Sequence, residues 1–154
     1  MKAVRLREGK ERSLLKKHPW VFAGSVDKGG GDSGETVRVE SSDGRFLAWA
    51  AYSARSQIRL RAWSFDEAER IDAAFFERRI AAAVALRGRL AIASDGVRLI
   101  HGEADGLPGL VVDRYADWLA VQVLTLGMER RSELIRAALE RVFHVPLVSA
   151  YGMT

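Results

Sequence analysis

The spacing of the apolar residues changes after Asp66, and this change constrains the fold more than any other feature of the chain. Before Asp66, apolar and polar residues alternate over short segments, which is typical of β-strands. Residues 71–90 are instead rich in alanine, and their larger apolar residues recur at helical spacing: Phe75, Phe76, Ile80, Val84 and Leu86. We therefore expect an α+β protein with two domains, at residues 1–70 and 71–154, and a long helix at the border.

The first domain should consist mainly of short strands. The pattern predicts strands at residues 3–7, 20–22, 35–40, 46–52 and 57–63, and a short helix at residues 11–17 that ends before Pro19. The glycines of residues 28–34 predict a flexible surface loop. Strands of this number and length in about 70 residues favour a compact barrel.

The second domain contains an apolar run, a turn and a second apolar run at residues 98–115. The turn holds Asp105-Gly106 and Pro108-Gly109, which supply a positive φ angle and a pre-set φ angle. Two strands joined by an acidic turn are expected, and an ordinary hairpin would explain the pattern. The pattern further predicts a strand at residues 118–125, an amphipathic helix at residues 129–143 and a last strand from residue 147. Together these elements make a small α/β domain that is incomplete.

Basic residues are concentrated at the N-terminal end. Residues 1–17 contain seven basic and two acidic side chains, whereas the whole chain has a formal net charge of +4. Arg59 and Arg61 share one face of the strand expected at residues 57–63. This distribution suggests a polyanionic partner, most simply nucleic acid. A solvated, lysine-rich helix face explains the N-terminal charges equally well.

Composition excludes several kinds of chemistry. The chain has no cysteine, which excludes disulfides, thiolate metal ligands and a thiolate nucleophile. A turn and a strand separate the carboxylates of Glu103, Asp105 and Asp113, and the three histidines lack metal-ligand spacing, so we expect no metal site. No apolar run reaches the roughly 18 residues of a membrane span. A charged N-terminus without a signal-peptide core makes a cytoplasmic location the expected one.

Three segments, in the same order, resemble the RlmI-like bacterial rRNA methyltransferases, which methylate cytosine at carbon 5 with S-adenosylmethionine. They are KERSLLKKHPWVFAG at residues 10–24, AYSARSQIRLR at residues 51–61 and GEADGLPGLVVDRY at residues 102–115. The resemblance runs from about Val4 to about Val148 and covers the front part of the family. Ala50 and Ala54 stand where the family usually has glycine and proline, so we expect a stiffer strand and an altered loop before Gln57.

The resemblance implies that residues 1–70 form a PUA domain, which is an RNA-binding pseudobarrel. PUA domains generally hold RNA between the first helix, the loop after it and a late strand, which correspond here to residues 11–17, 18–24 and 57–63. The implied RNA-binding residues are Arg12, Lys16, Lys17, His18, Arg59 and Arg61. Trp20 could stack on a base, but a tryptophan in an apolar run is more often a core residue.

The resemblance also bears on catalysis. Methylation of cytosine at carbon 5 normally needs a thiolate, and this chain has neither a cysteine nor a Gly-x-Gly loop after a strand for S-adenosylmethionine. The family's catalytic domain would follow the matched part. The chain is therefore expected to be the RNA-binding N-terminal portion of an rRNA methyltransferase, with no catalytic, cofactor-binding or metal-binding residue of its own. The alternative is a stand-alone PUA-type RNA-binding or protein-interaction module with no link to methylation.

Ribosomal RNA is the expected partner of the chain. A short last strand would leave one edge of the second sheet uncovered, and exposed edges pair with other chains. A homodimer through the C-terminal half is one expected outcome, and a monomer whose tail covers the edge is the other.

Overall fold

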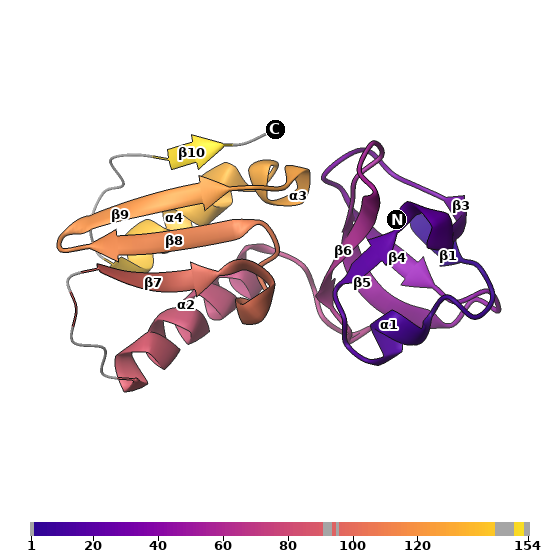
Figure 1. Ribbon diagram of the computed structural model, residues 1–154, viewed down its shortest axis with the longest axis horizontal. Helices are drawn as coiled ribbons and strands as arrows, with labels where there is room; N and C mark the ends of the chain where they lie inside the picture. Colours follow the sequence, from indigo (N-terminus) through magenta and orange to yellow (C-terminus); the bar gives the residue numbers. More distant parts are fainter. Residues whose placement is uncertain (1, 91–93, 95, 144–149, 153–154) are drawn as a thin grey trace. The chain divides into compact units, whose positions relative to one another are not determined.

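The computed structural model describes residues 2–90, 94, 96–143 and 150–152 (Figure 1). The chain divides into two compact units, Met1–Ile71 and Asp72–Thr154, which are called the first and second unit below. The first is built on a curled β-sheet and the second on a small sheet with helices. The expected α+β class, with a β-rich pseudobarrel followed by an α/β region, is confirmed.

The first unit contains a six-stranded sheet with the strand order β2-β6-β5-β4-β1-β3. Its strands are β1 (Ala3–Leu6), β2 (Trp20–Phe22), β3 (Val26–Gly29), β4 (Thr36–Glu40), β5 (Phe46–Tyr52) and β6 (Ile58–Ser64). Neighbouring strands are antiparallel except β1 and β4, which are parallel. A short helix, α1 (Arg12–Leu15), connects β1 to β2, and a 3-10 turn (Ala23–Ser25) connects β2 to β3.

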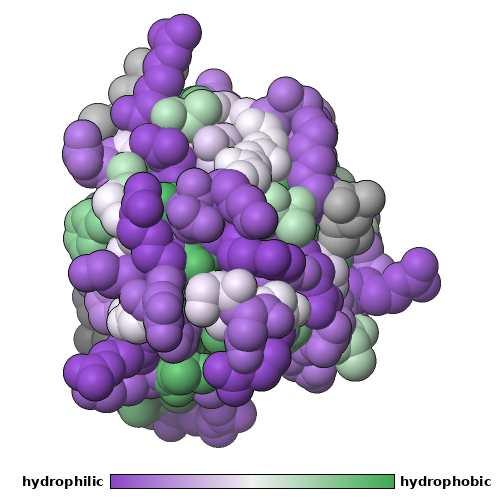
Figure 2. Space-filling view, turned by 90° about the vertical axis from the view of Figure 1, so that its right-hand side faces the viewer, coloured by the Kyte–Doolittle hydropathy of each residue, from purple (hydrophilic) through white to green (hydrophobic). Residues whose placement is uncertain are grey.

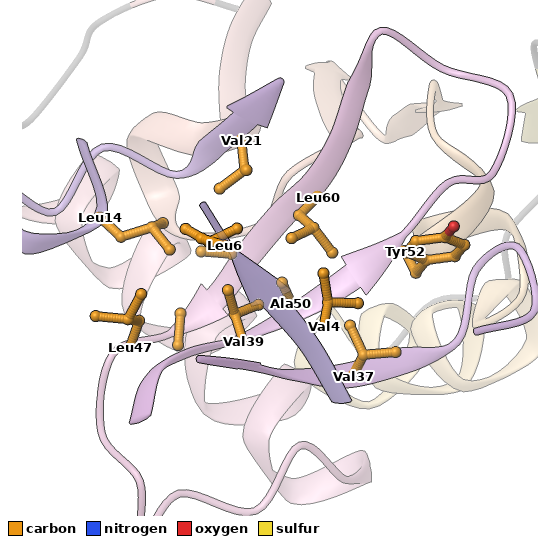
Figure 3. Packing of buried hydrophobic residues seen from close by; sticks show 12 residues of the cluster. Val4, Leu6, Leu14, Val21, Val37, Val39, Leu47, Ala50, Tyr52 and Leu60 are labelled. Carbon is orange, nitrogen blue, oxygen red and sulfur yellow. The ribbon is translucent and has the colours of Figure 1, made fainter. Parts of the chain in front are cut away.

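The inward-facing residues of these strands form the core of the first unit. In β4, alternation buries Val37 and Val39 and leaves Arg38 and Glu40 partly exposed. Figure 3 shows side chains from β1, β4, β5, β6 and α1 pointing toward one another. The most deeply buried are at most 2% exposed: Val4, Leu6, Leu14, Val21, Val37, Val39, Ala48, Ala50 and Leu60. Removing this apolar surface from water is the main term that stabilises the unit.

The glycine-rich segment at residues 28–34 is not entirely the loop that its composition predicts. Its first two residues belong to β3, which pairs with β1 so that Gly29 lies opposite Val4. Gly29 has a φ of 92°, and a Cβ atom there would collide with the carbonyl oxygen of Ala3. Glycine is needed at this position because the two strands approach closely, a requirement that single-residue propensity does not reveal.

The second unit contains a four-stranded sheet with the order β10-β9-β8-β7. Its strands are β7 (Gly96–His101), β8 (Leu110–Tyr115), β9 (Trp118–Val123) and β10 (Ala150–Gly152). The long helix α2 (Ala73–Arg89) packs against β7 and against α4 (Ser132–Phe143). Asp72 caps α2, because its Oδ1 accepts a hydrogen bond of 3.0 Å from the Phe75 amide. Figure 1 shows α4 behind β8 and β9.

The helix expected at residues 129–143 is α4, which begins at Ser132. A single-turn helix, α3 (Leu126–Glu129), precedes α4, and Thr125 caps it by accepting a hydrogen bond from the Met128 amide. The strand start expected at residue 147 lies outside the described residues. Further on, β10 pairs in parallel with β9, with Ala150 opposite Val121, so the chain's own tail lies on the β9 edge.

Hydrophilic residues cover most of the surface in the view of Figure 2, where hydrophobic residues form small, separate patches. Within the described part of the chain, no helix has the length and apolar character that crossing a membrane requires.

Candidate nucleic-acid interface

The end of α1 determines the position of Lys17. The Lys17 amide donates to the Leu14 carbonyl at 2.9 Å, and the His18 amide donates to the Ser13 carbonyl at 2.8 Å. This is the Schellman pattern, which requires a left-handed residue just after the helix. Lys17 takes that conformation with a φ of 65°. The predicted helix at residues 11–17 therefore ends at Leu15, and a lysine occupies a position that glycine normally takes.

The connection continues into β2, an edge strand that pairs with β6. Val21 lies opposite Leu60, and both are buried, so this pair faces the core. Trp20 lies opposite Arg61, and their side chains are on the outer face. The guanidinium carbon of Arg61 is 5.5 Å from the centre of the Trp20 ring, which is within cation–π range. The outer face of the β2–β6 pair thus carries a cation in contact with an aromatic ring.

His18 is held beside the same ring. Its Nδ1 accepts a hydrogen bond of 3.2 Å from the Trp20 amide, and its ring meets the Trp20 ring edge-on, with centroids 5.9 Å apart. This hydrogen bond requires an unprotonated Nδ1, so it assigns the proton of the neutral imidazole to Nε2. The exposed side chain of His18 can therefore donate an N–H to an acceptor such as a phosphate or carbonyl oxygen.

Two further cations lie along β6. The Lys17 ammonium is 4.8 Å from the centre of the Phe65 ring, which follows the end of β6. Arg59 lies where the pairing between β6 and β2 shifts register, and its Nε donates to the Ser56 carbonyl at 3.4 Å. Bulges of this kind re-aim side chains at the edge of a sheet.

The cations predicted to bind RNA differ in their pairing from those on β1 and β4. Within the described residues, Lys16, Lys17 and Arg59 form no ion pair with a carboxylate. Arg5 and Arg38, by contrast, pair with Glu40, at 3.0 Å each. The hydrogen bond from Arg5, followed by that from Arg38, holds the pKa of Glu40 below its usual range. Cations without a carboxylate partner are the ones available to an external anion.

Four of the six residues predicted to bind RNA lie on or beside the β2–β6 pair. Lys17, His18 and Arg61 each contact an aromatic ring there, and Arg59 lies in the adjoining bulge. Arg12 begins α1 and Lys16 follows its end, and both are exposed. RNA contact by the six residues stays a prediction.

The sequence favoured a core position for Trp20, with base stacking as the alternative, and gave no role to two other aromatic residues. Trp20 is only partly buried and faces outward, Phe65 lies under Lys17, and Phe22 is 53% exposed. The alternation Trp20-Val21-Phe22, with the smaller apolar residue in the middle, was the signal that the outer two residues share a face.

The acidic turn of the second unit is held by separate ion pairs. Asp105 binds Arg87 through two hydrogen bonds of 2.6 and 3.0 Å and also accepts from the His101 amide at 2.7 Å. Asp113 pairs with Arg98 at 2.8 Å. Among the described residues, no group of three histidine or carboxylate side chains is placed to hold a metal ion. The turn therefore has a structural explanation.

Comparisons with known proteins add to this geometry. Residues 4–65 match the family of PUA-like domains. The chain is also similar to proteins named ribosomal RNA large subunit methyltransferase I: those of Klebsiella pneumoniae, Erwinia tasmaniensis and Yersinia pestis are each 46% identical to it over 142 residues. These alignments cover 90% of this chain and 36% of each relative, so the chain spans about a third of their length.

Two solved structures share the fold. One is a putative SAM-dependent methyltransferase from Streptococcus mutans, with a TM-score of 0.82, and the other is a putative methyltransferase complexed with SAH, with a TM-score of 0.83. Each is 16% identical in sequence, and each match covers 99% of this chain and 40% of the other. The resemblance carried by the three sequence segments is confirmed.

Proposed function

We propose that this chain, a relative of the ribosomal RNA large subunit methyltransferases with a PUA-like domain at residues 4–65, is the RNA-binding portion of an S-adenosylmethionine-dependent rRNA cytosine-5 methyltransferase. The single observation that carries the RNA-binding part is the set of cations gathered at the outer face of the β2–β6 pair. By itself the chain binds RNA, with ribosomal RNA as the partner, and does not catalyse methyl transfer.

The contacts support this role in two ways. Lys16, Lys17 and Arg59 have no carboxylate partner in the described part of the chain, so binding a phosphate does not first require an ion pair to break. Arg61 and His18 are held against Trp20, which limits their freedom before RNA arrives. Groups ordered in advance lose less entropy on binding.

The test replaces Lys16, Lys17, Arg59 and Arg61 together with alanine and measures affinity for a structured rRNA fragment by fluorescence anisotropy. Affinity should fall, and the dependence of log affinity on log salt should flatten by roughly 0.7–0.9 for each phosphate contact removed. The matched control changes four exposed arginines elsewhere, Arg70, Arg89, Arg114 and Arg130, to alanine and removes the same charge. Equal losses in the two variants, or no loss in the first, would refute the proposed surface.

Two finer parts of the proposal concern the second unit. Residues 71–154 would form the linker helix and central domain that follow the PUA domain. A homodimer through the C-terminal half would have to compete with β10 for the β9 edge, or use the other edge strand, β7. Light scattering over a wide range of protein concentration measures the oligomeric state.

A further inference from the structure

The outer face of the β2–β6 pair carries two aromatic residues, and only one of them contacts a cation that the proposed function uses. Trp20 lies against Arg61 and His18. Phe22, two residues further along β2, is 53% exposed, although a phenyl ring gains free energy when it leaves water. Single exposed apolar side chains are common on proteins, so what Phe22 can do depends on the groups that surround it.

The local backbone explains why Phe22 faces outward. Val21 is 2% exposed and is the β2 residue whose side chain enters the core, so both of its neighbours leave the strand on the other side. β2 is also an edge strand, with β6 as its one neighbour in the sheet. The chain then leaves the strand at once, through the 3-10 turn Ala23–Ser25, whose first amide donates to the Gln57 carbonyl at 2.8 Å.

The charges around this strand indicate what its aromatic residues bind. Arg61 lies opposite Trp20, Arg59 occupies the bulge between the partners of Val21 and Phe22, and Lys16 and Lys17 precede the strand. Aromatic rings that alternate with cations can bind a ligand with both flat bases and phosphates. A single-stranded nucleic acid exposes both groups. In a duplex the base faces are stacked on one another and are not available to a side chain.

We propose that the RNA bound at this surface is unpaired, and that one of its nucleobases stacks on the exposed ring of Phe22. Trp20 and Phe22 are separated by about 6.6 Å along the strand. A single strand whose bases are splayed apart can place neighbouring bases at both positions. The inference rests on the proposed function and goes beyond it by naming the class of RNA and by assigning a base-binding role to Phe22.

The experiment compares three RNAs of the same length: a single strand, its perfect duplex, and the single strand with abasic nucleotides, which keep sugar and phosphate but lack bases. Phe22→Ala should weaken binding of the intact single strand about tenfold, which is within the range for loss of one stacked base. The Phe22→Ala variant should bind the duplex and the abasic strand with the same affinity as the unchanged protein. Phe22→Trp keeps a ring and should retain affinity for the single strand.

Controls separate this inference from the function on which it rests. Tyr115→Ala removes an aromatic side chain of similar exposure, 56%, from the second unit and should leave binding of all three RNAs unchanged. Thermal unfolding of Phe22→Ala should match that of the unchanged protein, because the ring is already half exposed. If the four-cation variant loses affinity but Phe22→Ala does not, stacking is refuted and the RNA-binding surface stands. If Phe22→Ala weakens all three RNAs equally, stacking is likewise refuted. If the unchanged protein binds no RNA, both proposals fail.

Discussion

At Lys17, the residue type that would stabilise the fold differs from the one that the proposed function needs. A non-glycine residue in the left-handed region costs about 1–2 kcal/mol, and Lys17 holds a φ of 65° at the end of α1. The Schellman hydrogen bonds of Lys17 and His18 keep it there. Glycine at this position would remove the strain but also the ammonium group beside Phe65. Strained residues persist where the surrounding structure over-determines them, and such positions are common at functional sites.

Two substitutions at Lys17 separate the strain from the charge. Lys17→Gly and Lys17→Ala both remove the ammonium group, so both should weaken RNA binding to the same extent. Only glycine relieves the left-handed strain, so Lys17→Gly should have a free energy of unfolding about 1 kcal/mol higher than Lys17→Ala. Urea denaturation followed by tryptophan fluorescence reports mainly on the first unit, which holds Trp20, Trp49 and Trp63, whereas Trp118 lies in the second.

Ala116 provides the matched control for this pair of variants. It is the other non-glycine residue with a positive φ, 53°, among the described residues, and it lies in the β8–β9 turn of the second unit. Ala116→Gly should relieve strain without changing RNA affinity. Different RNA affinities for Lys17→Gly and Lys17→Ala would show that backbone conformation, and not the charge, governs binding at this position.

Among the elements, the turn between β7 and β8, which contains the segment GEADGLPG, depends on contacts with other parts of the second unit. Its 3-10 helix (Gly102–Asp105) is held by Arg87 from α2 through Asp105, whose side chain is 6% exposed. Gly106 has a φ of 67°, and a Cβ atom there would collide with Arg79, whose Nη1 donates to the Gly106 carbonyl at 3.0 Å. Gly109 has a φ of 89°, and a Cβ atom there would collide with Thr125, the cap of α3. Asp105 and Gly106 thus contact α2, and Gly109 contacts the residue that caps α3.

Asp105→Asn should destabilise the second unit by about 3 kcal/mol, because it leaves the guanidinium of Arg87, which is 15% exposed, without its charged partner. The matched control is Asp113→Asn, which breaks a pair whose arginine, Arg98, is 48% exposed, and it should cost about 1 kcal/mol or less. Urea denaturation followed by far-UV circular dichroism measures both changes, since α2 and α4 supply most of the helix. Equal costs for the two variants would contradict a buried structural role for Asp105.

For the molecule as a whole, the absence of cysteine bears most directly on activity. Methylation of cytosine at carbon 5, the reaction named in the proposed function, needs a thiolate nucleophile, and the chain has no cysteine to supply one. The chain also spans 36% of the length of relatives named as methyltransferases, so their activity need not reside in the part that it matches.

This chain alone should therefore transfer no methyl group to ribosomal RNA. The measurement incubates it with rRNA and radiolabelled S-adenosylmethionine and counts label in the RNA. A full-length ribosomal RNA large subunit methyltransferase I serves as the positive control. Incorporation of label by this chain, dependent on its concentration, would overturn the expectation and require a nucleophile other than cysteine.

Local patterns in the sequence were sufficient to identify most of the elements. The short apolar runs at residues 20–22 and 46–52 gave the bounds of β2 and β5, since such runs between turn signals are typical of strands. The helical spacing after residue 71 identified α2, because it depends on neighbours within one or two turns. The three segments that resemble the methyltransferases identified the PUA-like domain before its structure was known.

Tertiary contacts decided the remaining features, because they join residues that lie far apart in the chain. β3 forms in a glycine-rich segment only because β1 lies beside it and Gly29 allows close approach. The pairing of Asp105 with Arg87 depends on where α2 places that arginine. Trp20 faces outward because β6 pairs with β2 in a register that puts Leu60, and not Arg61, opposite Val21. Charge and apolar content along a chain are local quantities, whereas the partners that bury or expose a side chain are set by strand register and helix packing.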